Sequence, residues 1–338
     1  MSDTPRYLVA GQLRREYYIT PAGRALLDVP GGSAVYAGVG AAVWQPDHPV
    51  GLVARVGQDY PQDWLAEFER RGLSTRGVRI LPETVDLRSF FAYSDENTRS
   101  RSDPVAHFAR IGQPFPKALL GYTNPEPRLD SRTRLSASSL RQGDIPSEYL
   151  DAAAAHLSPL DYLTHTLLPA VLRQAGFSTV TLDPSVGTML PTFWDDVPAL
   201  LTGLTAFIPN EEKLQALFYG RSTDLWEMAA AMASYGCELV VIKCGRRGQL
   251  LYEAATRNRW EIPAYPTRVV DPTGAGDAFC GGFLAGFRLT FDPLLAVMHG
   301  NIAASLAIEG SGPFYALDAL PGLAQARLEA LKQYVRKL

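Results

Sequence analysis

Residues 270–282 read Val-Asp-Pro-Thr-Gly-Ala-Gly-Asp-Ala-Phe-Cys-Gly-Gly, and this glycine-rich stretch runs directly into an apolar segment, 283–287, that favours a helix. Glycine lets the backbone adopt positive φ and lets other groups approach closely. A turn that opens a helix presents free N–H groups and the positive end of the helix dipole, so it favours anions. A helix cap is the simpler alternative for Asp277, but a cap does not require four neighbouring glycines.

The stretch does not match the two common phosphate-binding motifs. A dinucleotide fingerprint needs a glycine where Phe279 stands, and a P-loop needs a lysine where Asp277 follows Gly276. The backbone N–H groups of Ala275, Gly276 and Asp277 are instead suited to hold negative charge on a transferring phosphoryl group. The carboxylate of Asp277 is placed to accept the proton of an attacking hydroxyl. The pattern therefore favours phosphoryl transfer.

The composition is that of a soluble globular protein. Of 338 residues, 46% are hydrophobic and 20% charged, and the formal net charge of −3 gives no reason to expect nucleic-acid binding. The three cysteines lack metal-site spacing and indicate reduced thiols. The N-terminus has no apolar signal core and no apolar run is long enough to span a bilayer. We expect a cytoplasmic protein without a membrane partner.

Short apolar strands alternate with helices along most of the chain, which is typical of a doubly wound, mainly parallel sheet flanked by helices. We expect a single α/β domain over residues 1–338. Residues 12–22 and 78–111 break the alternation and are predicted to form a small inserted β-sheet that acts as a lid, whose exposed strands could pair across a homodimer. A hairpin without function is the alternative. Further predictions are strands at 105–111 and 162–166, helices at 148–157 and 323–337, and an irregular connection at 113–143.

Three stretches resemble the ribokinase-like (PfkB) family of sugar and nucleoside kinases. Residues 271–279, followed by two glycines, resemble its C-terminal signature. Residues 31–34 followed by 57–59 resemble its N-terminal signature, and residues 243–248 its nucleotide-side strand and turn. The resemblance covers nearly the whole chain. It implies a kinase that uses ATP and Mg²⁺ to phosphorylate a hydroxymethyl group of a sugar or a nucleoside.

The resemblance also implies roles for individual residues. Asp277 corresponds to the catalytic base, and Gly274, Ala275 and Gly276 correspond to the anion hole. Arg88 on the expected lid is in a position to reach a substrate or product phosphate. The remaining implied contacts are to the acceptor from Glu16, Gly31, Gly32 and Ser33, to ATP from Asn210, Lys243, Gly245, Gly248 and Asn301, and to a monovalent cation such as K⁺ from Asp271 and Thr273.

Three departures from the family pattern bear on function. Lys213 stands where the family often has a glutamate that organises the water shell of Mg²⁺; either Glu212 replaces it by a local shift or Lys213 contacts phosphate directly. Tyr36 replaces a common acceptor-pocket asparagine, which suggests stacking on the acceptor, with packing as the alternative. Arg14 favours an acceptor with negative charge, with a surface charge as the alternative. Metal handling and the identity of the acceptor stay open.

Three functions compete on these residues. The leading one is an ATP-dependent kinase for a sugar. The second is a nucleoside kinase of the same family. The third is a silent family member that binds sugar or nucleotide without turnover; Lys213 favours it, and the intact turn with Asp277 argues against it.

Overall fold

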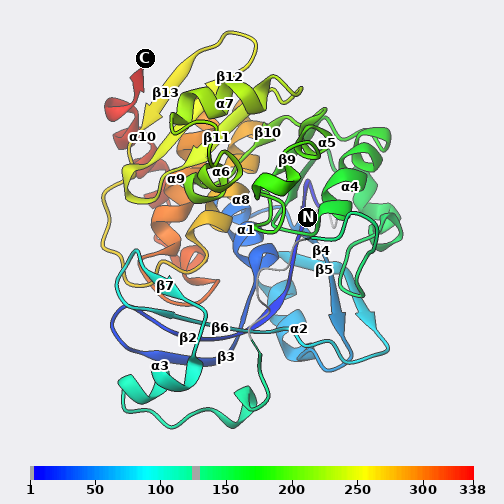
Figure 1. Cartoon of the computed structure of the whole chain (residues 1–338), viewed down its shortest axis with the longest axis vertical. Helices are drawn as coiled ribbons and strands as arrows, with labels where there is room; N and C mark the ends of the chain where they lie inside the picture. Colours follow the sequence, from blue (N-terminus) through cyan, green and yellow to red (C-terminus); the bar gives the residue numbers. More distant parts are fainter. Residues whose placement is uncertain (1–3, 124–129) are drawn as a thin grey trace.

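The computed structural model describes residues 4–123 and 130–338, which form two β-sheets, one large and one small (Figure 1). The large sheet consists, in chain order, of β1 (Tyr7–Ala10), β4 (Val50–Gly57), β5 (Leu73–Leu81), β8 (Ala154–Leu157), β9 (Thr179–Leu182), β10 (Ala206–Phe207), β11 (Leu239–Lys243), β12 (Gln249–Glu253), β13 (Arg259–Ile262) and β14 (Arg336–Lys337). Among the described residues its ten strands lie in the order β14-β13-β12-β11-β10-β9-β8-β1-β4-β5. All neighbours from β11 to β5 pair in parallel, and β12 to β14 add an antiparallel edge. The expected mainly parallel sheet is confirmed.

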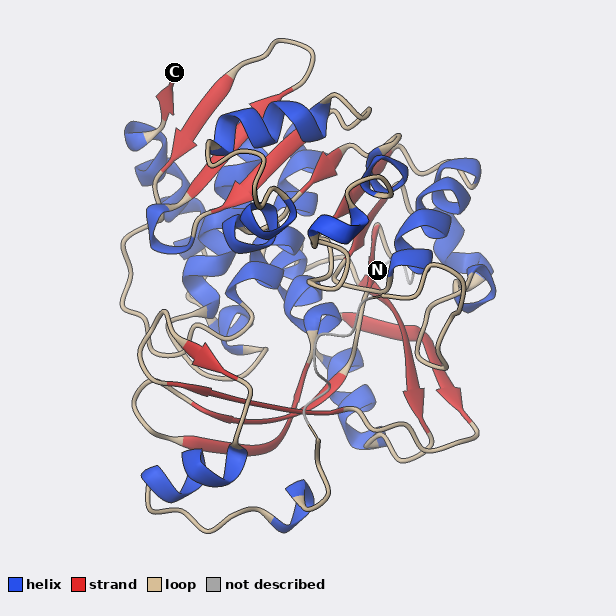
Figure 2. Cartoon of the chain, in the orientation of Figure 1, coloured by secondary structure: helices blue, strands red, loops and turns tan. Residues whose placement is uncertain are grey.

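Helices cover both faces of this sheet (Figure 2). One face carries α1 (Ser33–Ala42), α2 (Gln62–Arg70), α8 (Ala275–Thr290), α9 (Pro293–Ala307) and α10 (Leu323–Leu331), and the other carries α4 (Tyr162–Gln174), α5 (Val197–Leu201), α6 (Glu211–Leu217) and α7 (Leu225–Ala233). Successive side chains of a strand point to opposite faces, so Val9 of β1 packs with the first group and Leu8 with the second. Burial on both faces explains why the strands read as continuous apolar runs.

The small sheet has the strand order β3 (Ala25–Gly31), β2 (Arg14–Ile19), β6 (Arg88–Tyr93), β7 (Arg99–Ser100). Its outer face packs Tyr17 and Phe90 against Phe108 of α3 (Pro104–Arg110). Its inner face carries Tyr18 and Phe91 and hydrogen-bonds to the turn before α8. The sheet thus includes residues 25–31 and begins again at 88, whereas residues 78–81 of the expected lid belong to β5 of the large sheet.

Four element predictions are wrong. Residues 105–110 of the expected strand 105–111 belong to α3, because Asp103 caps the helix by accepting a hydrogen bond from the N–H of Ala106 and Pro104 occupies its first turn. Residues 154–157, expected in a helix, form the fully buried strand β8, and residues 162–166, expected as a strand, begin α4. The predicted terminal helix ends early, and residues 336–337 become β14. Short apolar runs do not distinguish a buried strand from a helix.

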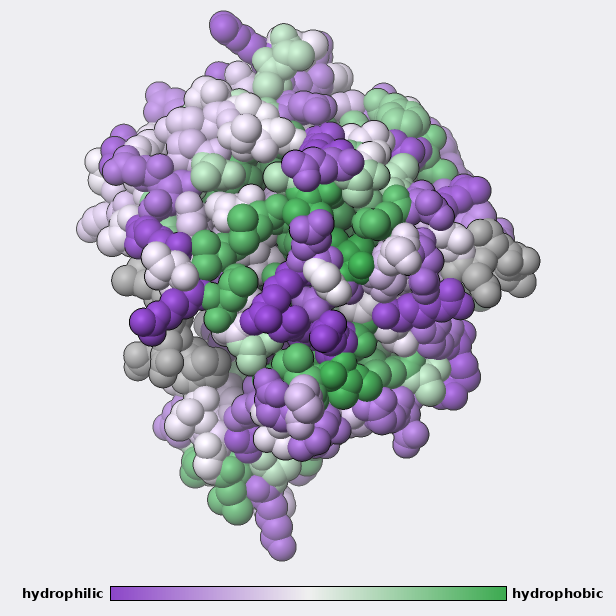
Figure 3. Space-filling model, turned by 90° about the vertical axis from the view of Figure 1, so that its right-hand side faces the viewer, coloured by the Kyte–Doolittle hydropathy of each residue, from purple (hydrophilic) through white to green (hydrophobic). Residues whose placement is uncertain are grey.

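Short 3₁₀ turns complete the described structure: η1 (Lys117–Leu119), η2 (Gln142–Asp144), η3 (Ser147–Asp151), η4 (Pro191–Phe193), η5 (Gly245–Arg247), η6 (Tyr315–Asp318) and η7 (Lys332–Tyr334). The connection expected at 113–143 contains η1 and the start of η2, and its residues 124–129 lie outside the described part of the chain. Within the described ranges, no helix combines the length and apolar character needed to cross a bilayer. On the face drawn in Figure 3, hydrophobic patches are interspersed with hydrophilic residues.

Candidate active site

The turn before α8 has the geometry expected of an anion site. Gly274 is the N-cap residue of α8 with φ 76°, a left-handed conformation that favours glycine. The N–H of Ala275 donates a 3.3 Å hydrogen bond to the carbonyl of Pro272. The N–H groups of Gly276 and Asp277 have no acceptor among the described residues, because both belong to the first turn of the helix. Two donors at the positive end of a 16-residue helix therefore remain available to an anion.

Asp277 lies in this first turn with its side chain partly exposed. Burial, followed by the nearby carboxylate of Asp183, raises the pKa of Asp277 to about 6, although the ammonium groups of Lys243 and Lys213 act in the opposite direction. A carboxylate with this pKa is ionised at neutral pH and is more basic than an ordinary aspartate. The combination suits a general base that acts near neutral pH.

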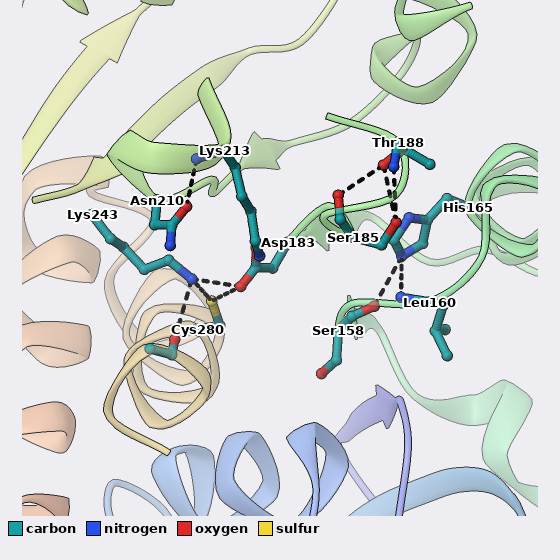
Figure 4. Close-up of polar contacts among 11 residues, drawn as sticks. Ser158, Leu160, His165, Asp183, Ser185, Thr188, Asn210, Lys213, Lys243 and Cys280 are labelled. Atoms are coloured by element: carbon teal, nitrogen blue, oxygen red, sulfur yellow. Dashed lines mark hydrogen bonds and ion pairs between the residues drawn. The ribbon is translucent and has the colours of Figure 1, made fainter. Parts of the chain in front are cut away.

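Asp183, directly after β9, is the centre of a charge cluster beside the turn (Figure 4). Its Oδ1 lies 2.7 Å from Nζ of Lys213, and its Oδ2 lies 2.6 Å from Nζ of Lys243. The ammonium of Lys243 also contacts the carbonyl oxygen of Gly276 at 3.4 Å and Sγ of Cys280 at 3.3 Å. Although burial raises the pKa of Asp183, the two ammonium groups lower it to about 2 overall. The cluster thus connects β9, α6, β11 and the first turn of α8.

The other residues expected at the nucleotide have structural contacts. Asn210 caps α6 by accepting a 2.9 Å hydrogen bond from the N–H of Lys213. Gly245 and Gly248 form the turn between β11 and β12, and Gly248, with φ 92°, lies close to the end of β13. The amide of Asn301 donates to Gln249 and to the carbonyl of Pro263, and accepts from the N–H of Tyr265. The described residues therefore already use the hydrogen-bonding groups of that amide, and the position of Asn301 near the nucleotide stays a prediction.

Glu16 lies on the inner face of the small sheet, 6% exposed, opposite the N-terminus of α1. Its Oε1 accepts a 2.9 Å hydrogen bond from the N–H of Gly32, and its Oε2 lies 3.5 Å from the hydroxyl of Tyr36. A Cβ on residue 31 would lie 2.1 Å from the carboxyl carbon of Glu16, so Gly31 makes room for this side chain. Burial raises the pKa of Glu16 to about 7, opposed chiefly by the hydrogen bond from Gly32. Ser33 accepts a 3.3 Å hydrogen bond from the N–H of Gln12, so it holds the chain before β2.

The stacking prediction for Tyr36 is wrong. Its ring is 3% exposed and lies where a side chain on residue 274 would sit, with a distance of only 2.0 Å from a Cβ built there to Cδ1 of the ring. Tyr36 therefore packs against Gly274 in the turn before α8, and neither face of its ring is free to stack on an acceptor. The packing alternative holds.

The prediction that Arg88 reaches a substrate or product phosphate is wrong as well. Arg88 pairs with Arg15 in the register of β2 and β6, so it shares the outer face of the small sheet. There it forms an ion pair with Asp86 at 2.8 Å and donates to the carbonyls of Ala118 and Leu120. Arg14, one residue before Arg15, belongs to the inner set with Glu16 and donates a 3.0 Å hydrogen bond to Gln12.

Asp271 and Thr273 connect the turn to the small sheet. The carboxylate of Asp271, 1% exposed, accepts from the hydroxyl of Tyr18 at 2.9 Å and from the N–H of Thr273 at 3.0 Å. The hydroxyl of Thr273 contacts that of Tyr93 at 3.4 Å. These contacts hold the turn against the inner face of the sheet. The monovalent-cation role of the two residues stays a prediction.

Sequence reasoning missed three charged residues. Asp183 directly follows β9, and a carboxylate at the carboxyl end of a parallel strand is the signal that could have identified it. Arg99 lies in β7 with its guanidinium 5.5 Å from the centre of the Phe91 ring. Its charge lowers the pKa of both Glu16 and Asp277, which burial raises. Arg101 follows β7, and burial, then the charges of Arg99 and Arg14, lower its pKa.

The side chains present do not suit a magnesium ion held by protein carboxylates. Glu212 is exposed and takes no part in the Asp183 cluster, and its replacement of the family glutamate stays a prediction. Glu211 pairs with Arg247. Asp183 is held by two lysines, and the described part of the chain contains no group of three or more His, Cys, Asp or Glu that could bind a metal. Oxygen-rich donor sets are what Mg²⁺ requires.

Comparison with known proteins gives concordant results. A family model described as pfkB family carbohydrate kinase matches residues 9–320. A cytidine kinase from Thermococcus kodakarensis is 29% identical over 282 residues, which cover 83% of this chain and 87% of the relative. A putative ribokinase II from E. coli, solved in complex with ATP and Mg²⁺, superposes with a TM-score of 0.69 at 19% identity and covers 98% of this chain and 99% of that one.

A second solved structure, the nucleoside kinase of Burkholderia thailandensis in complex with inosine, has a TM-score of 0.66 at 20% identity and covers 97% of this chain and 99% of its own. At such identities the structural likeness concerns the fold. The cytidine kinase and the family model add a likeness in sequence over most of the chain.

Proposed function

The chain belongs to the PfkB family of carbohydrate kinases, and from this premise we propose that it transfers the γ-phosphoryl group of ATP to a hydroxymethyl group of a sugar or nucleoside. Membership makes the chain a phosphotransferase that acts on an alcohol group. The observation that carries the proposal is the placement of Asp277 in a helix-opening turn beside two lysines, where the N–H groups of Gly276 and Asp277 have no acceptor among the described residues.

The chemistry follows from this placement. The acceptor hydroxyl oxygen attacks the γ-phosphorus, the bond from that phosphorus to the β,γ-bridging oxygen breaks, and ADP leaves. The carboxylate of Asp277 accepts the proton of the hydroxyl, and a positioned base of this kind contributes roughly 10²- to 10⁴-fold. The N–H groups of Gly276 and Asp277 face the negative charge that spreads over the transferring group. Mg²⁺ would arrive bound to the phosphates of ATP, because the carboxylates of Asp183 and Glu211 are engaged in ion pairs with basic side chains.

Glu16 and Arg14 are the proposed acceptor contacts. The Glu16 carboxylate is oriented by Gly32, and its remaining lone pairs can accept from acceptor hydroxyls. A sugar is the first acceptor class. A nucleoside is the second, supported by the cytidine kinase relative and by the inosine complex of the Burkholderia enzyme. Tyr36 is no longer an argument for a nucleoside, because its ring is buried under Gly274.

The experiment is an acceptor panel. The full chain is incubated with ATP and Mg²⁺ and with pentoses, hexoses, cyclitols, cytidine or inosine, and ADP release and the mass of the phosphorylated product are measured. We expect ADP and a phosphorylated product with one acceptor class. ATP binding without ADP release from any acceptor would contradict the proposal and favour the silent binder.

A further inference from the structure

The Asp183 cluster carries more positive than negative charge in a nearly closed space. The side chains of Asp183, Lys213 and Lys243 are 4%, 12% and 11% exposed, so one carboxylate faces two ammonium groups with little water between them. Asp277 is a further carboxylate whose charge interacts with both lysines, but it forms no ion pair with either of them. Unbalanced charge is costly in such surroundings, so the cluster is suited to an anionic ligand.

The two lysines differ in how fully their hydrogen-bond donors are used. The ammonium of Lys243 contacts Asp183, the carbonyl of Gly276 and Sγ of Cys280, which accounts for its three N–H groups. The ammonium of Lys213 contacts only Asp183 among the described residues. Lys213 therefore keeps two donors for a ligand, and Asp183 holds them in place (Figure 4).

The position of Lys213 indicates which ligand atoms it meets. Its helix, α6, follows β10, and β10 lies between β9, which ends at Asp183, and β11, which ends at Lys243. Lys243 in turn contacts the first turn of α8, where the N–H groups of Gly276 and Asp277 are available. The free donors of Lys213 and those of the α8 turn are therefore linked through Asp183 and Lys243, whose own hydrogen-bonding groups are engaged. A chain of several phosphates fits this arrangement better than a single phosphate does.

We infer that Lys213 binds the terminal phosphates of a nucleoside triphosphate directly, so that a fixed ammonium supplies charge compensation where protein carboxylates do not hold a metal. A lysine ammonium is an established type of phosphate contact, acting as a compact point charge. The inference rests on the proposed function for the identity of the donor. Asp183 is then a positioning residue, which holds both ammonium groups beside the first turn of α8.

The test measures nucleotide binding without turnover. Isothermal titration calorimetry of the full chain in EDTA, with ATP, inorganic triphosphate and AMP as probes, is compared for the unaltered protein, Lys213→Met, Lys213→Gln and Lys213→Arg. We expect ATP and triphosphate to bind the unaltered protein without metal. Both neutral variants should lose about tenfold in affinity for these two probes, the scale of one charge-assisted hydrogen bond, with AMP binding unchanged. Lys213→Arg should retain most of the affinity.

The control variant is Lys332→Met, which removes an exposed lysine paired with Glu329 and should leave all three affinities unaltered. The inference is overturned if the unaltered protein binds ATP only after Mg²⁺ is added, or if neither neutral variant weakens ATP binding. A loss that extends equally to AMP also overturns it, because Lys213 would then act on the fold. Lys213-dependent ATP binding together with an inactive acceptor panel would reject the proposed function and leave the inference standing.

Discussion

The two sides of the candidate site are built in different ways. On one side, the α8 turn takes its glycine cap, free N–H groups and base from the contiguous residues 274–277. On the other side, the small sheet contributes Glu16 from β2, together with Arg99 from β7, and these residues come together only when distant strands pair. The functional groups of a turn come from neighbouring residues, whereas the set of side chains on one face of a sheet depends on the register in which its strands pair. Predictions should therefore be firmest for the turn.

The strongest test of the turn is Asp277→Asn. The amide has nearly the same shape but cannot accept the proton, so we expect turnover to fall by about 10²- to 10⁴-fold. ATP affinity should change little, because the free N–H groups and lysines remain. Initial-rate kinetics and calorimetry check the two parts. Turnover within tenfold of the unaltered protein would show that Asp277 is not the base. The base would then have to come from a residue outside the α8 turn.

The pH dependence of turnover is the second test. Asp277 acts as a base only when ionised, and burial, then Asp183, raises its pKa to about 6. Turnover should therefore be full above this pH and decline as pH falls, reaching about one hundredth of its plateau near pH 4, since one proton changes the active fraction about tenfold per unit. The measurement uses saturating concentrations of both substrates, so that the fall in turnover reports on Asp277 and not on an effect of Glu16 titration on acceptor binding. A flat profile from pH 4 to 8 would contradict the assignment.

The sheet side is tested by a matched pair of arginine variants. Arg14→Met removes a charge from the inner face, and the acceptor KM should rise about tenfold, as for one lost charge-assisted contact. Arg88→Met removes a charge from the outer face, and the acceptor KM should stay unchanged. Thermal melting should show a modest loss of stability for Arg88→Met, about 1 kcal/mol, because its contacts to Asp86, Ala118 and Leu120 are lost. Equal effects of the two variants on the acceptor KM would contradict the assignment of Arg14 to the face that binds the acceptor and of Arg88 to the opposite face.

The smallest expected effect concerns the contact between the two sides. Glu96, in the turn between β6 and β7, pairs with Arg246 of η5, and the two side chains are 37% and 63% exposed. Exposed ion pairs contribute about 1 kcal/mol or less, so Glu96→Gln should raise either KM by less than about fivefold. The effect should vanish at high salt because the charges are screened. A large, salt-independent change would mean that this contact controls closure of the small sheet.

Much of the α8 turn could be predicted from the sequence. Gly274 and the base candidate Asp277 are neighbours in the chain, and the chemistry of a helix-opening turn does not depend on distant residues. The Asn210 cap of α6 is a similarly local feature, because its side chain accepts from the N–H of Lys213 three residues later. The role of Asp183 could not be predicted, because its partners, Lys213 and Lys243, are 30 and 60 residues away.

The sequence by itself determined the mainly parallel α/β architecture and the glycine-capped turn that opens α8, because alternating apolar strands and helices and a run of glycines express their preferences locally. Only the tertiary structure decided that Tyr36 supports Gly274, that Arg88 points away from the site, and that Lys213 joins Lys243 on Asp183. Strand pairing and packing bring these groups together, and a change of one residue in register would reverse which face each side chain occupies.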